Sequence, residues 1–307
     1  MKKRFICIFM IATLLLSTVS SFAYQENDLS STFSPTVEMT TISEYEEALH
    51  LTEQLNAVKE FDAISNDITP LDEYKLAFDE RAQLPAETLK DLGYSEEEIQ
   101  LLKDYADGKL SFDEVAPRAS AVLSTVLSSS LYTTTQYKVR YTWSWDKTPA
   151  GTKKDTAILA VQGIDSSSHT LNTRISNKES KVTYYVDDTY NKVESATLEV
   201  NGSYVTATYN KYKLTDNGNN WMWVKSGYLE VTLVPSISGG DTFAAVRARG
   251  ELAVPTPHVD SYSIAVAYSP SGTITITLTV ETGRGTINHY GKVQKVFYNN
   301  GTYKSET

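Results

Sequence analysis

Residues 137–145, YKVRYTWSW, alternate between apolar and polar side chains without a break. Successive side chains of an extended strand point to opposite faces, so this period of two places all five apolar and aromatic residues on one face. A strand with one large apolar face and one polar face is typical of an antiparallel sheet that covers a core.

Further runs with strand composition continue to the C-terminus, separated by turn signals. The residue pair at 201–202, Asn-Gly, is a strong signal for a two-residue hairpin, and those at 216–218 and 226–227 are weaker ones. About ten short antiparallel strands predict a β-sandwich, of jelly-roll or immunoglobulin-like topology. The other runs lie at 157–161, 181–186, 196–200, 203–209, 221–225, 228–234, 243–254, 262–268, 273–281 and 293–298.

The part of the chain before these strands has a helical pattern. Ser43 with Glu46, and Ser95 with Glu98, have the spacing of capping boxes. A further helix is predicted to begin at Thr69-Pro70, a short one to end at Gly93, and the one after it to end at Gly108.

Charge divides the chain in the same place. Residues 24–117 hold 23 acidic and 6 basic side chains, whereas residues 118–307 hold 15 and 19, with all four Trp. We therefore predict an α+β protein in which an acidic helical region, 24–117, is followed by a Ser-rich linker, 118–130, and a β-sandwich, 131–307. The acidic helices are expected to form a solubilising domain or, alternatively, to dock on the mildly basic sheet.

The N-terminus resembles an export signal. Lys2, Lys3 and Arg4 precede an apolar run at 5–16, and Ser21-Phe22-Ala23 fits a small-x-small cleavage site. We predict that residues 1–23 are a signal peptide and that the protein is secreted, without a membrane span after cleavage. Because the single Cys lies at position 7, the mature chain is expected to have no disulfide, thiolate metal site or thiol nucleophile.

Two stretches resemble a group of uncharacterised secreted proteins of Gram-positive bacteria. One is the helix–LGY–helix unit at 84–99, LPAETLKDLGYSEEEI, and the other is YTWSWDKTP at 141–149 with TKKDTAI at 152–158. The chain departs from that group at 153–156 and at 161–163. The resemblance implies an architecture and an extracellular location, and it implies no activity.

Common catalytic signatures are missing from the sequence: it has no His-Glu-x-x-His, no Gly-x-Ser-x-Gly and no phosphate-binding Gly-rich loop. His258 and Asp260 are the candidates for a positioned imidazole and carboxylate, although a solvated loop explains them more simply. Residues 107–114 resemble half of an EF-hand loop, but Lys103 and Tyr105 stand where calcium needs oxygen ligands. Helix ends at Gly108 and Ser111 explain this segment better, so we expect no metal and no organic cofactor.

Two Trp-x-Trp pairs are the main candidates for binding. Each pair lies on one face of a predicted strand, so it forms an aromatic strip that is either part of the core or, if exposed, a surface that stacks on sugar rings or binds a protein. The core is the favoured interpretation. The candidate binding residues are Trp143, Trp145, Trp221 and Trp223.

The leading functional hypothesis is a secreted, non-catalytic binding or interaction module for an extracellular polysaccharide or a surface protein. The acidic composition argues against nucleic acid as a partner. The alternative is a secreted polysaccharide or cell-wall hydrolase with a pair of carboxylates about 5–10 Å apart. Acids available in predicted loops are Asp146, Asp187, Asp188 and Asp241.

Overall fold

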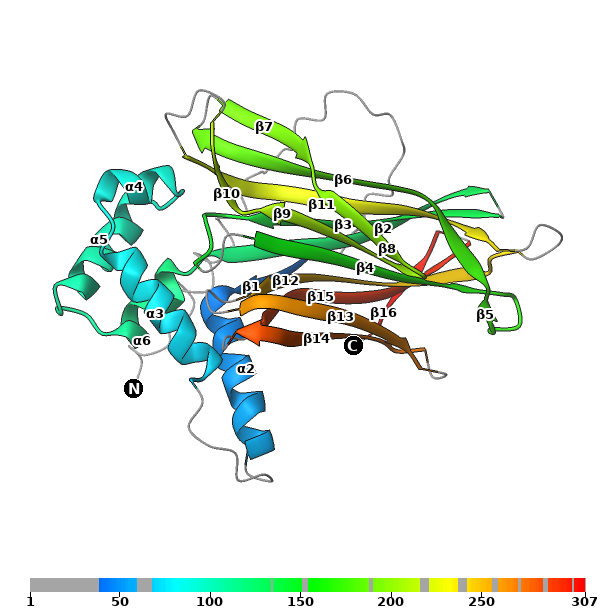
Figure 1. The fold of residues 1–307 in the computed structure, drawn as a ribbon, viewed down its shortest axis with the longest axis horizontal. Helices are drawn as coiled ribbons and strands as arrows, with labels where there is room; N and C mark the ends of the chain where they lie inside the picture. Colours follow the sequence, from blue (N-terminus) through cyan, green and yellow to red (C-terminus); the bar gives the residue numbers. More distant parts are fainter. Residues whose placement is uncertain are drawn as a thin grey trace, which may run out of the picture. The chain divides into compact units, whose positions relative to one another are not determined.

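Antiparallel sheets dominate the structure, and a group of helices lies near its N-terminal end (Figure 1), which confirms the predicted α+β class with its antiparallel sandwich. The structure is a computed structural model. It describes residues 39–59, 68–133, 135–150, 154–187, 190–215, 221–236, 242–255, 259–269, 272–283, 287–299 and 301–306. The predicted signal peptide, residues 1–23, lies outside these ranges.

The first sheet has seven strands, and residues 137–145 lie near its middle. Its order is β1-β2-β3-β11-β6-β7, with β10 paired to one end of β11. The strands are β1 (Met39–Ser43), β2 (Val122–Thr133), β3 (Gln136–Trp145), β6 (Thr173–Asp187), β7 (Tyr190–Ser195), β10 (Tyr212–Leu214) and β11 (Trp221–Pro235).

The second sheet also has seven strands, in the order β16-β15-β12-β4-β9-β8, with the short β5 beside β4. The strands are β4 (Lys154–Ile164), β5 (Thr170–Leu171), β8 (Thr197–Asn201), β9 (Tyr204–Asn210), β12 (Ala245–Pro255), β15 (Ile287–Tyr298) and β16 (Tyr303–Glu306).

The main core fills the space between the two sheets. Along β3 the burial alternates residue by residue, as the sequence pattern predicts, and Tyr137, Val139 and Tyr141 face inward. Trp143 stacks on Tyr209 of the second sheet, with ring centroids 5.6 Å apart. The aromatic face of β3 therefore joins the two sheets.

A separate hairpin covers the outer face of the second sheet and adds a third layer. Its strands are β13 (Val259–Tyr268) and β14 (Ile274–Gly283). Ile274 and Ile276 of the hairpin pack with Ile158 and Ala160 of β4 in a second core. Strand β4 is consequently buried on both faces, whereas β3 is buried on one.

Within residues 44–119, which we call the helical cap, the described parts contain five helices that share a core of their own. The predicted capping boxes at Ser43 and Ser95 are confirmed, since each hydroxyl accepts the N–H of the glutamate three residues on. Thr69 caps the helix that starts at Pro70, as expected. The helices are α2 (Glu44–Lys59), α3 (Pro70–Ala82), α4 (Ala86–Asp91), α5 (Glu96–Ala106) and α6 (Phe112–Ala119).

The cap is inserted between two neighbouring strands of the first sheet, which the sequence did not indicate. Strand β1 precedes the cap and pairs with β2, which follows it. The predicted linker at 118–130 is wrong for most of its length, because β2 begins at Val122. Its serines hid the pattern: Ser124, Ser128 and Ser130 lie on the half-buried face of β2, while Leu123 and Leu127 point into the core.

The cap packs against one end of the sandwich, so the docking alternative for the acidic helices describes the structure. The Trp223 indole donates to the carbonyl of Asp91 at 3.1 Å, and the backbone N–H of Thr148 donates to the carbonyl of Leu92 at 2.9 Å. Acidic groups of the cap meet lysines of the sandwich: Glu98 pairs with Lys147. The opposite charges of the two regions thus face each other across a built interface.

Two turn signals had different outcomes. The hairpin predicted at 201–202 exists, with the turn one residue later, at 202–203, and Gly202 at φ +62°. The turn predicted at 226–227 is wrong, because both residues lie inside β11. Glycine at position 227 leaves room for the Trp143 ring, because a Cβ on residue 227 would lie only 2.5 Å from that ring.

We predict that Gly227→Ala destabilises the protein by about 1–3 kcal/mol, the usual range for overpacking a core. The added methyl group would press against the Trp143 ring and the carbonyl of Lys181, which is backbone and cannot turn away. Urea unfolding followed by tryptophan fluorescence measures the change. Ser226→Ala, at the preceding half-buried position, is the matched control, and equal stability of the two variants would contradict the prediction.

Candidate functional site

The aromatic pairs singled out in the sequence belong to the core wherever their side chains are described. Trp143, Trp145 and Trp223 are 0–2% exposed. They therefore have no free ring face to stack on a sugar, and the proposal that they bind a ligand is corrected in favour of the core interpretation. Trp221 lies on β11, and its side chain is outside the described residues.

The candidate acids and the candidate histidine also form no site among the described residues. Asp146 accepts the backbone N–H groups of Val122 and Lys147, both at 2.7 Å, which makes it a structural cap of the chain turn. Asp260 is exposed at the start of β13, and His258 lies outside the described residues. The side chains of Asp187, Asp188 and Asp241 also lie outside them.

The segment that resembles half of an EF-hand is a helix end followed by a helix start. Gly108 takes the left-handed conformation, φ +73°, at the end of α5, and the Ser111 hydroxyl and N–H both donate to Glu114. Lys109 pairs with Asp107 at 2.9 Å, in a place where a calcium ion would need the acid. Within the described residues no group of three His, Cys, Asp or Glu side chains could hold a metal ion.

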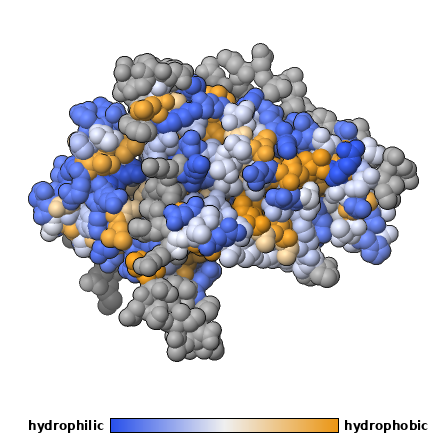
Figure 2. Space-filling view, viewed as in Figure 1, coloured by the Kyte–Doolittle hydropathy of each residue, from blue (hydrophilic) through white to orange (hydrophobic). Residues whose placement is uncertain are grey.

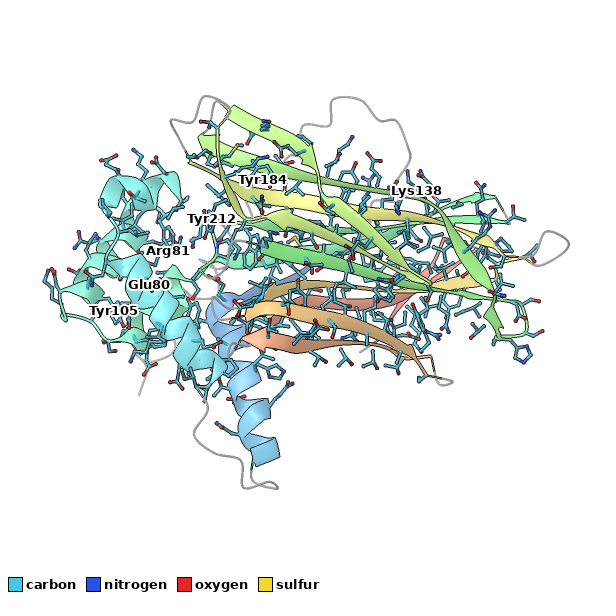
Figure 3. The ribbon with its side chains drawn as sticks, viewed as in Figure 1. Glu80, Arg81, Tyr105, Lys138, Tyr184 and Tyr212 are labelled. Carbon is cyan, nitrogen blue, oxygen red and sulfur yellow. The ribbon has the colours of Figure 1, made fainter. Side chains whose placement is uncertain are left out.

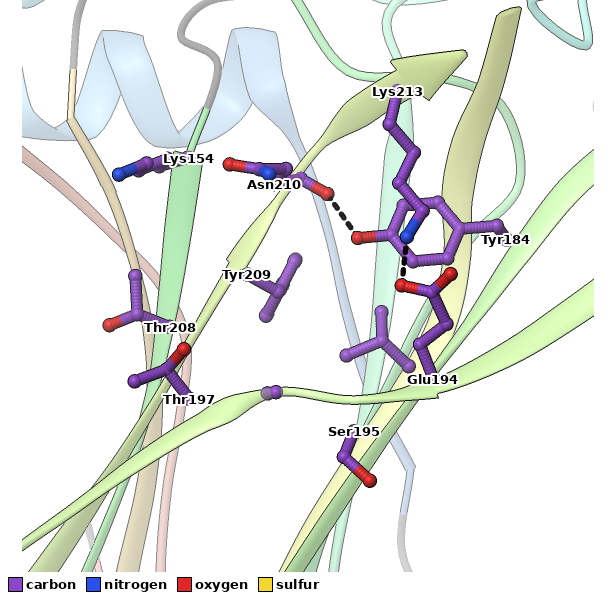
Figure 4. A pocket seen from close by; sticks show the side chains of 11 residues that line it. Lys154, Tyr184, Glu194, Ser195, Thr197, Thr208, Tyr209, Asn210 and Lys213 are labelled. Atoms are coloured by element: carbon purple, nitrogen blue, oxygen red, sulfur yellow. Dashed lines mark hydrogen bonds and ion pairs between the residues drawn. The ribbon is translucent and has the colours of Figure 1, made fainter. Parts of the chain in front are cut away.

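A small polar pocket opens between the edges of the two sheets, where the chain passes from β7 to β8 (Figure 4). Its volume is about 220 Å³, below the roughly 300–1,000 Å³ of pockets for drug-sized ligands. It therefore has room only for a small ligand or a part of a larger one. The lining residues are Lys154, Val182, Tyr184, Glu194, Ser195, Ala196, Thr197, Thr208, Tyr209, Asn210 and Lys213.

The walls of the pocket are held by interactions among its own residues. Lys213 pairs with Glu194 and lies over the Tyr184 ring at 4.6 Å, and the Tyr184 hydroxyl donates to the carbonyl of Asn210 at 2.7 Å. Figure 4 shows the Lys213–Glu194 and Tyr184–Asn210 contacts as dashed lines on one side of the pocket, with Thr197 and Thr208 on the other. Hydroxyl, amide and ammonium groups thus make up most of the lining, to which the half-buried Ala196 adds a small apolar part.

A buried ion pair lies directly behind this pocket. Lys211 and Asp155 are each 1% exposed, and Lys211 Nζ lies 3.5 Å from Asp155 Oδ1 and donates to the carbonyl of Ala150 at 3.3 Å. Glu44, the first residue of α2, is 2% exposed and is attracted by the same lysine. One buried ammonium group therefore serves an acid of the sandwich and an acid of the cap.

Burial dominates the protonation of both acids. It raises the pKa of Glu44 from 4.5 to about 7, against the lowering effect of Lys211 and of backbone N–H groups. Burial likewise raises the pKa of Asp155 to about 6, with Lys211 again opposing it. Asp155 in turn contributes to the raised pKa, about 12, of Tyr184 in the pocket, after burial itself.

A further buried acid, Glu251, lies on the outer face of the second sheet. Glu251 is fully buried, contacts His289, and pairs with Arg249 at 3.2 Å. Arg249 also donates to the carbonyl of Ile274 at 2.9 Å, which ties this cluster to the hairpin. With its carboxylate oxygens engaged by these two side chains, the cluster serves to attach the third layer.

The outer surface is mixed. Figure 2 shows a face on which hydrophilic residues prevail, crossed by several groups of hydrophobic ones. No helix among the described residues is long and apolar enough to cross a membrane. The large hydrophobic side chains most exposed in the described part are Met39, Ile68, Leu76, Val193, Val200, Leu214, Tyr298 and Tyr303.

Comparison with known proteins identifies no family. No protein-family model matches the chain, and no curated protein matches its sequence. A solved structure described as AvmM, which catalyses macrocyclization in alchivemycin A biosynthesis, aligns at 9% identity over 48% of this chain and 79% of that chain, with a TM-score of 0.19. A likeness this low supports no inference about function.

Sequence reasoning missed the pocket altogether. Its residues come from β4, β6, β7, β8, β9 and β10, and neighbours such as Lys154 and Asn210 are far apart in the chain. Each residue on its own is an ordinary strand residue. The one available signal was weak: a basic residue beside an acid, Lys154-Asp155, at the start of a strand that is otherwise apolar.

We predict that the free energy of unfolding falls as the pH rises from about 5 to about 8. Glu44 and Asp155 hold their protons more tightly in the folded state than in the unfolded one, so the folded state binds more protons in this range. Each pKa unit corresponds to about 1.4 kcal/mol. Urea unfolding at several pH values measures the slope.

Glu44→Gln isolates the contribution of the cap. The glutamine side chain is uncharged at every pH, so the stability of the variant should depend less on pH. At pH 8 its free energy of unfolding should exceed that of the unmodified protein by about 1–3 kcal/mol. Glu97→Gln, at a position with 78% of its side chain exposed, is the control. Parallel pH profiles for Glu44→Gln and the unmodified protein would show that Glu44 does not take up the proton.

Proposed function

We propose that this protein is exported and acts outside the cell as a non-catalytic binding module whose pocket takes one unit of an extracellular or cell-surface polysaccharide. The observation that carries the proposal is the pocket at the sheet edges, lined mainly by hydroxyl, amide and ammonium groups with the half-buried Ala196 among them. Sugar rings present hydroxyl groups at their rim and C–H groups on their faces, so such a lining suits them.

The contacts in the pocket favour binding over catalysis. Its one acid, among the described lining residues, is Glu194, which is engaged by Lys213 and by Lys192 at 3.1 Å. Hydrolysis of a glycosidic bond needs two carboxyl groups that face the same bond. Asp155 lies close by, but it is buried on Lys211 and does not line the pocket.

The proposed location rests on the N-terminal sequence. A basic start, an apolar run and the small-x-small site ending at Ala23 favour export through a signal peptide. The resemblance to secreted proteins of Gram-positive bacteria favours such a source. Exposure to wall or capsular polysaccharide would follow from that location.

For the binding proposal, we expect the purified protein to co-sediment with at least one of cellulose, chitin, xylan and peptidoglycan. Asn210→Ala should weaken the binding about tenfold, because a hydrogen bond of ordinary strength is lost at the pocket wall. Asn201→Ala, an exposed asparagine at the far end of β8, is the matched control. Failure to bind any of the four, or equal losses in both variants, would refute the proposal, and release of reducing ends would favour a hydrolase.

For the export proposal, we expect protein recovered from the culture medium to begin at Tyr24, since cleavage is predicted after Ala23. N-terminal sequencing or intact-mass measurement determines the first residue. Ala23→Arg, which places a large charged side chain at the cleavage site, should leave the precursor uncleaved. Recovery of an intact chain that starts at Met1 in the medium would contradict the prediction.

A further inference from the structure

Two short segments of the chain belong to the pocket and to the cap interface at the same time. On β4, Lys154 lines the pocket while the next residue, Asp155, is buried behind it. Residues 209–213 behave in the same way: Tyr209, Asn210 and Lys213 line the pocket, whereas Lys211 and Tyr212 contact the loop beneath the cap. The pocket wall and the cap anchors are therefore neighbours along one short segment, which runs from the end of β9 into β10.

Tyr212, the first residue of β10, connects this segment to the cap. Its hydroxyl donates to the carbonyl of Pro149 at 2.9 Å and accepts from the Arg81 guanidinium at 3.4 Å. In Figure 3 Tyr212 lies between Arg81 on helix α3 and Tyr184 in the sheet. Tyr212 itself does not line the pocket.

Arg81 is the corresponding anchor on the cap. It is 7% exposed and donates to the carbonyls of Thr148 and Pro149 at 3.2 and 3.1 Å. A guanidinium with this many fixed acceptors holds one geometry, since its donors form a rigid planar fork. The loop at 148–150, Tyr212 and helix α3 are thus locked together.

The backbone holds the second half of this segment weakly, whereas Tyr209 and Asn210 belong to the ladder between β9 and β4. Strand β10 has three residues, and it pairs with β11 only at Tyr212–Trp223, Lys213–Met222 and Leu214–Trp221. One further backbone bond joins the Val224 N–H to the carbonyl of Lys211 at 3.0 Å. So short a ladder contributes little stability of its own, and side-chain anchors carry a large share of the local order.

We propose that Tyr212, held by Arg81, is a positioning residue for the pocket: docking of the helical cap holds residues 209–213 in the conformation that forms the pocket wall and thereby sets its affinity for a ligand. This inference rests on the proposed function in so far as the pocket is taken as the binding site. The cap is then a functional part of the site, although it contributes no residue to the pocket lining.

The test is Tyr212→Phe, which removes a single hydroxyl and keeps the ring. Hydrogen–deuterium exchange, read by mass spectrometry, should quicken about tenfold in peptides that cover 209–214, a ratio that corresponds to one lost hydrogen bond. Co-sedimentation with cellulose, chitin, xylan and peptidoglycan should weaken by a similar factor. Arg81→Lys, which keeps the charge and loses the fork, should give the same two changes.

Tyr105→Phe is the matched control, because it removes a hydroxyl that contacts Asp79 inside the cap, away from the pocket. It should leave exchange at 209–214 and binding unchanged. The proposal is overturned if Tyr212→Phe leaves that exchange unchanged, or if exchange quickens while binding does not weaken.

The exchange measurement separates this inference from the proposed function. If the unmodified protein binds none of the four polysaccharides, the proposed function fails. Exchange at 209–214 still decides whether the cap positions the segment, because it needs no ligand. Quickening confined to this segment, with the melting temperature unchanged, supports positioning over general destabilisation.

Discussion

The buried ammonium group of Lys211 is the constraint on which the joining of sandwich and cap depends. A lone charge in an apolar interior costs several kcal/mol, so Lys211 needs acids and carbonyls close by. Asp155 comes from the sandwich, Ala150 from the loop beneath the cap, and Glu44 from the first helix. Its two contacts, with Asp155 and with the carbonyl of Ala150, join the sandwich to the loop on which Arg81 of the cap is anchored, and Glu44 adds a longer-range attraction.

The layers of the sandwich follow from how many faces each strand must bury. The face of β3 that holds Trp143 packs on the second sheet, while its other face meets solvent. Strand β4 has apolar residues on both faces, and a single sheet above it would leave Ile158 and Ala160 in water. The hairpin of β13 and β14 covers them, which is the physical reason for a third layer.

These two constraints meet at the pocket. The start of β4 and the end of β9 leave the core there, and their residues divide between the open edge and the cap. At this edge polar side chains from several strands come together next to buried residues of the core. Because the cap is inserted between β1 and β2, it is tied to the sandwich at both of its ends. The proposed role of the cap in shaping the pocket follows from that attachment.

Most helices and strands could be predicted from the sequence, because the patterns that specify them are local. The alternation at 137–145 defined β3, and the Ser95–Glu98 spacing defined the start of α5, since both depend on residues a few positions apart. Strand β2 was missed because its local composition is dominated by Ser and Thr. Leu123 and Leu127, which carry its inward face, were too few to show the period of two.

Which faces are buried, and which residues meet, depends on the packing of distant parts of the chain. A Trp at position 143 looks the same in sequence whether it faces a second sheet or water, and the partner layer settles it at 0% exposed. Gly227 resembled a turn, yet it makes room for that indole from a neighbouring strand. The pocket and the buried pairing of Lys211 with Asp155 could not be predicted either. Both arise where strands distant in the chain meet, and no local pattern encodes such a meeting.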